Sequence, residues 1–247
     1  MSSLAELSPL VWSVLAVGAI VVGLSKTAAP GGGTVAVALF AAVLPAKVST
    51  GALLVLLIVG DAMALLSYRR HADLRIILRL APAVLVGLVA GWAFLEFASD
   101  GWVRRVIALI LLLVVGVTLW RRSRSAESTP GGRVARWSYG SLGGFTTMVA
   151  NAAGPVMSMY FLASRLEVKR FLGTSAWFFA IVNVAKLPFS VSLGIITPAS
   201  LLVDLILAPV VVVAGLVGRR LATRMSQRVF ERLVIILTIV GALYLLA

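Results

Sequence analysis

The sequence predicts an all-α, polytopic membrane protein. Hydrophobic residues make up 61% of the 247 positions and charged residues only 13%, whereas a soluble domain is closer to half apolar and a quarter charged. The mean hydropathy is +1.07, and several apolar stretches reach the roughly 20 residues that span a bilayer. The first apolar run is preceded by Glu6 and by no basic residue, which is unlike a cleaved signal peptide.

The chain contains two kinds of apolar stretch. Uninterrupted stretches, each long enough to cross the membrane, lie at 48–68, 74–96, 102–120, 171–193, 199–218 and 230–246. Two others are interrupted, 9–44 by a polar break at 25–33 and 137–163 by a break around 146–155. The arms of the second have about 13 residues each, or about 20 Å, short of the roughly 30 Å bilayer core. We therefore predict two helical hairpins whose tips lie inside the membrane.

The polar segment 121–136 separates two halves that resemble each other. Leu-Ala-Pro at 80–82 reappears at 207–209, and the spacing from Gly51 to Asp61 is that from Gly173 to Asn183. Each half is predicted to be one broken hairpin followed by three full crossings. The predicted boundaries are a first transmembrane repeat at 1–124, a cytoplasmic linker at 125–134 and a second transmembrane repeat at 135–247.

The basic residues predict the topology. Most of the 22 Lys and Arg residues fall into four clusters, at 69–79, 121–136, 165–170 and 219–232, and basic loops of membrane proteins are mostly cytoplasmic. With all four clusters in the cytoplasm, the two halves insert in opposite orientations and both termini are periplasmic or extracellular. Such inverted-topology repeats typically enclose a midplane site in alternating-access carriers.

The first break, Gly23 to Gly33, is rich in hydrogen-bond donors. Ser25, Lys26 and Thr27 precede Pro30, and the amides of Gly31, Gly32 and Gly33 lead into a half-helix whose positive end points at the break. Donors without acidic acceptors suit an oxyanion, so these residues are predicted to bind substrate. The alternative is a lysine that extends to the membrane interface, beside glycines that only permit close packing.

The second break offers Thr147, Asn151 and Gly154 as further substrate-binding candidates. The Asn151 amide both donates and accepts, so it could contact one ligand oxygen, and it could equally cap the half-helix. Pro155 suits the first turn of the half-helix that follows.

Two ionisable residues lie inside long apolar helices, where a charge is costly unless it is paired or hydrated. Lys186 is predicted to add positive field to the substrate site, and Asp61 is the candidate for a coupling proton. A structural pair is the alternative for both. Asn183 lies one turn before Lys186, so these two are expected to share a helix face. Asp204, near a helix start, is interpreted as favouring the positive helix end.

Several function classes are disfavoured. The chain has no cysteine and one histidine, His71, in a basic loop, and it contains no HExxH or GxSxG string. We therefore predict no enzyme activity, no metal site and no cofactor. Despite a net charge of +13, the basic residues mark loops rather than a nucleic-acid surface. The expected partners are the lipid bilayer and a small anion. An anion channel remains open as an alternative, as does the oligomeric state, with a homodimer as one option.

A set of specific motifs lies in the first half of the chain. They are the break GLSKTAAPGGG, the Pro45, Lys47 and Val48 positions before Ser-Thr-Gly, the turn Tyr68-Arg69-Arg70 before Asp73, and Leu80-Ala81-Pro82 with Gly87 and Gly91. With these motifs the sequence resembles the sulfite exporter TauE/SafE family, also called the 4-toluene sulfonate uptake permease family. Lys26 departs from the lysine-free glycine runs frequent in that family. The resemblance implies a transporter of sulfite, small organosulfonates or related sulfur anions in the bacterial cytoplasmic (inner) membrane, without a cofactor. A carrier of a non-sulfur anion, such as a carboxylate, remains an alternative.

Overall fold

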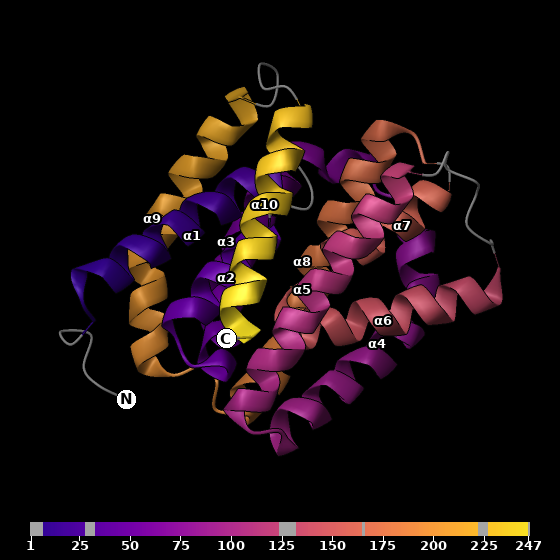
Figure 1. Ribbon diagram of the computed structural model, residues 1–247. Helices are drawn as coiled ribbons and strands as arrows, with labels where there is room; N and C mark the ends of the chain where they lie inside the picture. The colour runs from indigo at the N-terminus through magenta and orange to yellow at the C-terminus, as the bar shows by residue number, and fades with distance from the viewer. Residues whose placement is uncertain (1–6, 28–32, 124–131, 165, 222–226, 247) are drawn as a thin grey trace.

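A computed structural model describes residues 7–27, 33–123, 132–164, 166–221 and 227–246. These residues form helices and no strands, which confirms the predicted all-α class (Figure 1). The helices are α1 (Pro9–Thr27), α2 (Gly33–Val43), α3 (Ala46–Tyr68), the 3-10 turn η2 (Arg69–His71), α4 (Leu74–Phe97), α5 (Asp100–Ser123), α6 (Arg133–Ala150), α7 (Ala153–Ala163), α8 (Val168–Ser192), α9 (Pro198–Leu221) and α10 (Gln227–Leu246).

The described helices fit a multi-pass membrane protein. By length and composition, α1, α3, α4, α5, α8 and α9 could each cross a bilayer. Large apolar side chains point outward from the outer helices, as lipid contact requires; examples are Leu85, Val86 and Val89 on α4 and Leu205, Ile206 and Val213 on α9.

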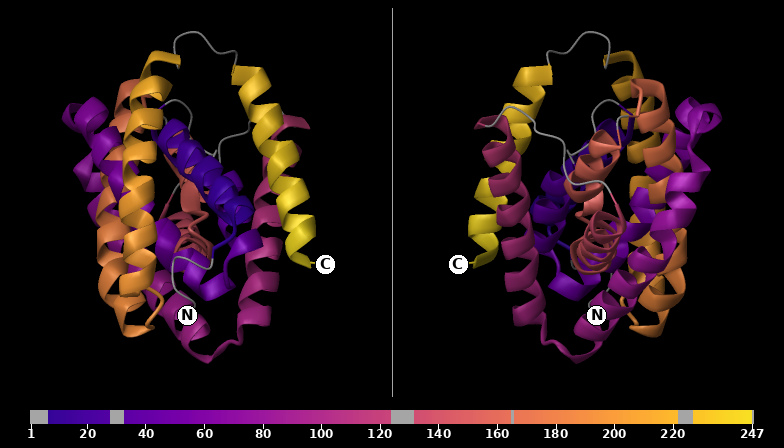
Figure 2. Two further views of the ribbon diagram at one scale, coloured as in Figure 1. Left: turned by 90° about the vertical axis from the view of Figure 1, so that its left-hand side faces the viewer. Right: turned by 90° about the vertical axis from the view of Figure 1, so that its right-hand side faces the viewer.

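Several of the helices begin or end at one of two opposite ends of the bundle. Figures 1 and 2 show α9 ending and α10 beginning at one end of the bundle, whereas the turn from α4 to α5 lies at the opposite end. The last turn of α9 carries Arg219 and Arg220, and α5 begins with Asp100. The assignment of these ends to the two sides of a membrane stays a prediction.

Both interrupted stretches form pairs of helices in contact, α1 with α2 and α6 with α7. Their arms are unequal: α1 has 19 residues and α2 has 11, and α6 has 18 residues and α7 has 11. The prediction of two arms of about 13 residues in the second hairpin was therefore wrong. Helix α6 begins at Arg133 and includes Arg136, which the hydropathy pattern assigns to the linker. The Arg133 side chain is exposed and the Arg136 side chain is half-buried.

The second break has a clear local cause. Asn151 ends α6 with a left-handed backbone (φ 52°, ψ 26°), a conformation that Asn adopts more readily than most residues. The Asn151 amide donates to the Thr147 carbonyl at 3.0 Å, and the Ala152 amide donates to the Thr146 carbonyl at 3.2 Å. The chain then reverses into α7. The first break, which includes Pro30, falls on residues 28–32, outside the described part of the chain.

The long arm of each hairpin packs against a helix of the other half of the chain, α1 along α9 and α6 along α4 (Figure 1). Glycines allow the backbones to touch. A Cβ added at Gly144 on α6 would meet the Val84 carbonyl oxygen and lie 3.0 Å from both the Gly87 Cα and the Leu88 nitrogen. The Gly87 and Gly91 spacing thus serves a contact within this chain, between α4 and α6.

The α1–α9 contact uses the same device. A Cβ added at Gly23 would meet the Val211 carbonyl oxygen and lie 2.8 Å from both Ala214 Cβ and the Gly215 nitrogen. Between the two crossed pairs, α3 packs against α8, α9 and α1. The centre of the molecule is therefore formed by α3, α8 and the two hairpins.

Asp204 is buried, with 1% of its surface exposed. It lies beyond the first turn of α9, which contains no acidic residue, so its interpretation as a partner of the positive helix end was wrong. Both of its carboxyl oxygens lack a hydrogen-bond partner among the described residues. Such a group destabilises an apolar interior.

We expect Asp204→Asn to raise the apparent melting temperature in detergent by about 2–4 °C, the shift that about 1 kcal/mol produces in a protein of this size. The matched change Asp61→Asn should lower it, because Asp61 is ion-paired with Lys26 and its loss leaves a buried ammonium alone. Thermal unfolding followed by size-exclusion chromatography measures both. Equal losses for the two variants would show that Asp204 has a stabilising partner.

Candidate functional site

A cavity of about 280 Å³ lies between the two hairpins, α3 and α8. Six helices contribute its lining: α1, α2, α3, α6, α7 and α8. Of the residues predicted to bind substrate or a proton, those that line it are Ser25, Lys26, Thr27, Gly33, Asp61, Thr147, Asn151 and Gly154. Lys186 lies behind the wall, fully buried. Gly31 and Gly32 fall outside the described residues.

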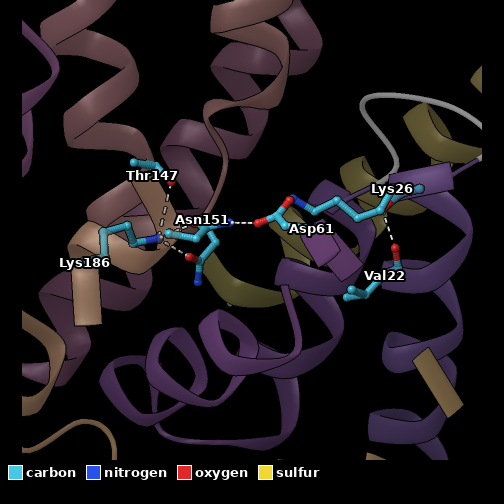
Figure 3. A network of polar contacts seen from close by, with 8 residues as sticks. Val22, Lys26, Asp61, Thr147, Asn151 and Lys186 are labelled. Atoms are coloured by element: carbon cyan, nitrogen blue, oxygen red, sulfur yellow. Dashed lines mark hydrogen bonds and ion pairs between the residues drawn. The ribbon is translucent and has the colours of Figure 1, made fainter. Parts of the chain in front are cut away.

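Lys26, in the last turn of α1, forms an ion pair with Asp61 on α3 (Figure 3). The exposed fractions of the two side chains are 15% and 2%. The ammonium also lies 4.9 Å from the centre of the Phe179 ring, a favourable cation–π distance. Gly60 makes room for the lysine stem, because a Cβ there would lie 2.9 Å from Lys26 Cγ. Lys26 is thus neutralised by a carboxylate from its own chain.

A chain of polar side chains continues from this pair into the second half of the protein. Asp61 Oδ2 accepts from Asn183 Nδ2 at 2.6 Å, and Asn183 Oδ1 accepts from Lys186 Nζ at 3.4 Å. The last contact confirms that Asn183 and Lys186 share a face of α8.

Lys186 completes this polar chain at the second hairpin. Its ammonium donates to Thr147 Oγ1 at 3.3 Å and to Asn151 Oδ1 (Figure 3). The network therefore runs from the end of α1 through α3 and α8 to the tip of the second hairpin.

Asn151 has two roles at that tip. Its backbone ends α6, and its side chain joins the hairpin to α3 by donating from Nδ2 to the Thr50 carbonyl oxygen at 2.9 Å. Thr50 returns a bond from Oγ1 to the Val149 carbonyl at 3.0 Å. Asn151 therefore ends the helix, as one of the two interpretations expected, while its contact with a ligand oxygen stays a prediction.

The two short helices begin at the cavity. Gly33 and Thr34, at the start of α2, line it, as do Gly154 and Pro155 at the start of α7. The first amides of a helix have no partner within the helix, and its N-terminal end has a partial positive charge. The cavity therefore faces two positive helix ends, in addition to Lys26.

The hydroxyls of the first tip point back to their own helix. Ser25 Oγ donates to the Val22 carbonyl at 3.0 Å and Thr27 Oγ1 donates to the Gly23 carbonyl at 2.9 Å. In this conformation neither is a free donor for a ligand, contrary to the expectation from their position. Among the described residues of the first tip, the lysine and the start of α2 remain as donors.

Sequence reasoning missed part of the lining. Tyr68 lines the cavity and its hydroxyl donates to the Thr27 carbonyl at 3.3 Å. Ser158 also lines it, one turn after Gly154 on α7, so helical spacing from the break would have found it. Ser175 on α8 is a further lining residue. The described part of the chain contains no group of three or more His, Cys, Asp or Glu side chains that could hold a metal.

A helical, multi-pass chain with a polar cavity between broken helices has the arrangement of a membrane transporter. The sulfite exporter TauE/SafE family model matches residues 15–245. The chain therefore belongs to this family, which confirms the resemblance seen in its motifs. No curated protein and no solved structure matches the chain.

Proposed function

We propose that this protein is a secondary transporter of sulfite or small organosulfonate anions. The observation that supports this most directly is the convergence of Lys26 and two helix N-termini, at Gly33 and Gly154, on one cavity. Lys186 adds a second ammonium behind Asn151 and Thr147. Cationic donors and helix N-termini form the strongest hydrogen bonds to oxyanions.

A sulfur oxyanion fits this lining. A sulfite or sulfonate group has three oxygens, which can take donors from several directions at once. Apolar residues complete the wall beside the polar ones; they include Leu57, Ala64, Leu172 and Ala176. These side chains would accommodate the organic part of a sulfonate. The name of the family, sulfite exporter, agrees with this choice of substrate.

We further propose that the chain is an inverted-topology repeat that works by alternating access. Its halves are 1–124 and 135–247, joined by a cytoplasmic linker, with both termini on the periplasmic or extracellular side of the bacterial inner membrane. The reciprocal packing of α1 on α9 and α6 on α4 supports this symmetry. Rocking of one half against the other would open the cavity to each side in turn.

Asp61 is our candidate for a coupling proton. It is the carboxylate in the described lining of the cavity, and it lies between a lysine and Asn183. If the Lys26 ammonium moves away from Asp61 in a later state of the transport cycle, after the anion has left, the buried carboxylate loses its cation and a proton stabilises it.

The test is flux of radiolabelled sulfite into proteoliposomes that contain a pH-sensitive dye. We expect saturable uptake, counterflow against unlabelled sulfite, inhibition by methanesulfonate, and proton movement that Asp61→Asn abolishes. Liposomes without protein are the control. If sulfite, sulfonates and sulfate neither move nor compete while a carboxylate does, the substrate proposal is wrong. Large single-channel currents without counterflow would instead indicate an anion channel.

A further inference from the structure

The polar chain across the cavity wall has one positive charge in excess. Lys26 and Lys186 are the cations, and Asp61 is the anion, paired directly with Lys26 and joined to Lys186 through Asn183. Lys186 is fully buried and Asp61 is 2% exposed. Lys26 and Asp61 are the ionisable side chains in the described cavity lining besides the phenol of Tyr68. We propose that this excess selects anions with a single negative charge over anions with two.

This inference rests on the proposed function and narrows its substrate class. Organosulfonates and hydrogensulfite have one negative charge, whereas sulfate and fully ionised sulfite have two. Inside a membrane protein, an uncompensated charge is costly because water cannot screen it. A single negative charge in the cavity makes the whole cluster neutral. A second negative charge leaves the cluster unbalanced again.

Lys186 provides the excess charge although it does not touch the cavity. Its Nζ donates to Thr147 Oγ1, Asn151 Oδ1 and Asn183 Oδ1. Three acceptors match the three protons of an ammonium, and all three are neutral. Thr147, Asn151 and Asn183 line the cavity, so the charge of Lys186 lies one side chain behind the wall. Lys186 is therefore a positioning residue for the anion, acting through these three.

Asp61 sets the limit of one charge. Both of its oxygens are engaged, one by Lys26 and the other by Asn183, so the carboxylate is held in the wall as the internal counter-ion of Lys26. An anion in the cavity lies beside this carboxylate. Each added negative charge on the anion increases the repulsion from Asp61, and a dianion is therefore disfavoured relative to a monoanion of similar size.

The proposal predicts that the preference for monoanions over dianions depends on the net charge of Lys26, Lys186 and Asp61. The probes are methanesulfonate, with one negative charge, and sulfate, with two, measured by calorimetry on the purified protein. We expect the wild type to bind methanesulfonate about 10- to 100-fold tighter than sulfate. Asp61→Asn, which adds one net positive charge, should reverse the preference. Asp61→Asn combined with Lys186→Gln returns the net charge of the cluster to its native value and should restore the preference for methanesulfonate.

Asp204→Asn is the matched control, because it removes a buried carboxylate outside the described cavity lining and should keep the wild-type ratio. If Asp61→Asn cannot be purified, Lys186→Gln alone tests the proposal: a neutral wall should bind methanesulfonate at least about tenfold more weakly.

Two results would overturn the charge rule while leaving the proposed function intact. One is an Asp61→Asn variant that keeps the wild-type ratio of methanesulfonate to sulfate affinity. The other is a double variant that still binds sulfate more tightly than methanesulfonate. If the wild type binds neither probe and no sulfite, the proposed function itself fails, and the charge rule fails with it.

Discussion

Replacement of Lys26 with methionine is expected to lower sulfite flux by about 100- to 4000-fold. The side chain is the one ammonium in the described lining of the cavity, and it holds the Asp61 carboxylate. Removing one partner of a buried ion pair costs about 3–5 kcal/mol, and each 1.4 kcal/mol is a factor of about ten. The variant therefore loses its contact with the anion and gains an unpaired carboxylate beside the cavity. Initial uptake rates in proteoliposomes measure the effect.

Two further variants separate transport from stability. Lys26→Met combined with Asp61→Asn removes both charges, so it should recover thermal stability but not flux. Lys47→Met is the matched lysine control: Lys47 lies in the first turn of α3, outside the described cavity lining, and its loss should leave flux near the wild-type rate. Normal uptake by Lys26→Met would exclude Lys26 from the substrate site.

Replacement of Gly144 with valine should prevent the protein from folding. The added Cβ meets the Val84 carbonyl oxygen, the Gly87 Cα and the Leu88 nitrogen, all of them backbone atoms of α4. No side chain can rotate away to relieve the clash, so α6 must separate from α4. We expect a cost of at least about 3 kcal/mol, the upper part of the range for overpacked interiors. Yield of monodisperse protein in size-exclusion chromatography is the measurement.

Gly116→Val makes the same chemical change in α5, where a Cβ meets nothing within 4 Å. This variant should elute and melt like the wild type, apart from the small helix-propensity difference between the two residues. Comparable losses at positions 116 and 144 would mean that membrane insertion, rather than the α4–α6 contact, limits the yield.

Much of the fold could be predicted because the helix boundaries are set by residues at or next to them. Pro45 before α3, the Asp73 side chain that caps α4, and Asn151 at the end of α6 each mark a helix boundary close to the predicted one. The predicted span 48–68 corresponds to Ala46–Tyr68, and 74–96 corresponds to Leu74–Phe97. Hydropathy failed at α6, where an amphipathic first turn extends the helix beyond its apolar part.

The partners of the polar residues could not be predicted with the same success. Lys26 and Asp61 are separated by 35 positions, and Asn183 and Asp61 by 122, so no spacing rule connects them. The sequence singled out both lysines and Asp61, because charges within apolar helices are conspicuous. It did not reveal that Asp61 neutralises Lys26, nor that Ser25 and Thr27 bond back to α1. Those contacts depend on how α3 and α8 pack, which hydropathy does not specify.

The packing of α1 against α9 and of α6 against α4, across the two halves of the chain, has a consequence for biosynthesis. While the ribosome is still making the first half, α9 is not yet present to cover the glycine face of α1, and α6 is not yet present to pack against α4. The first-half helices contact one another, α1 with α2 and α3 among them, but the close backbone contacts at their glycines form only after translation has supplied α6 and α9.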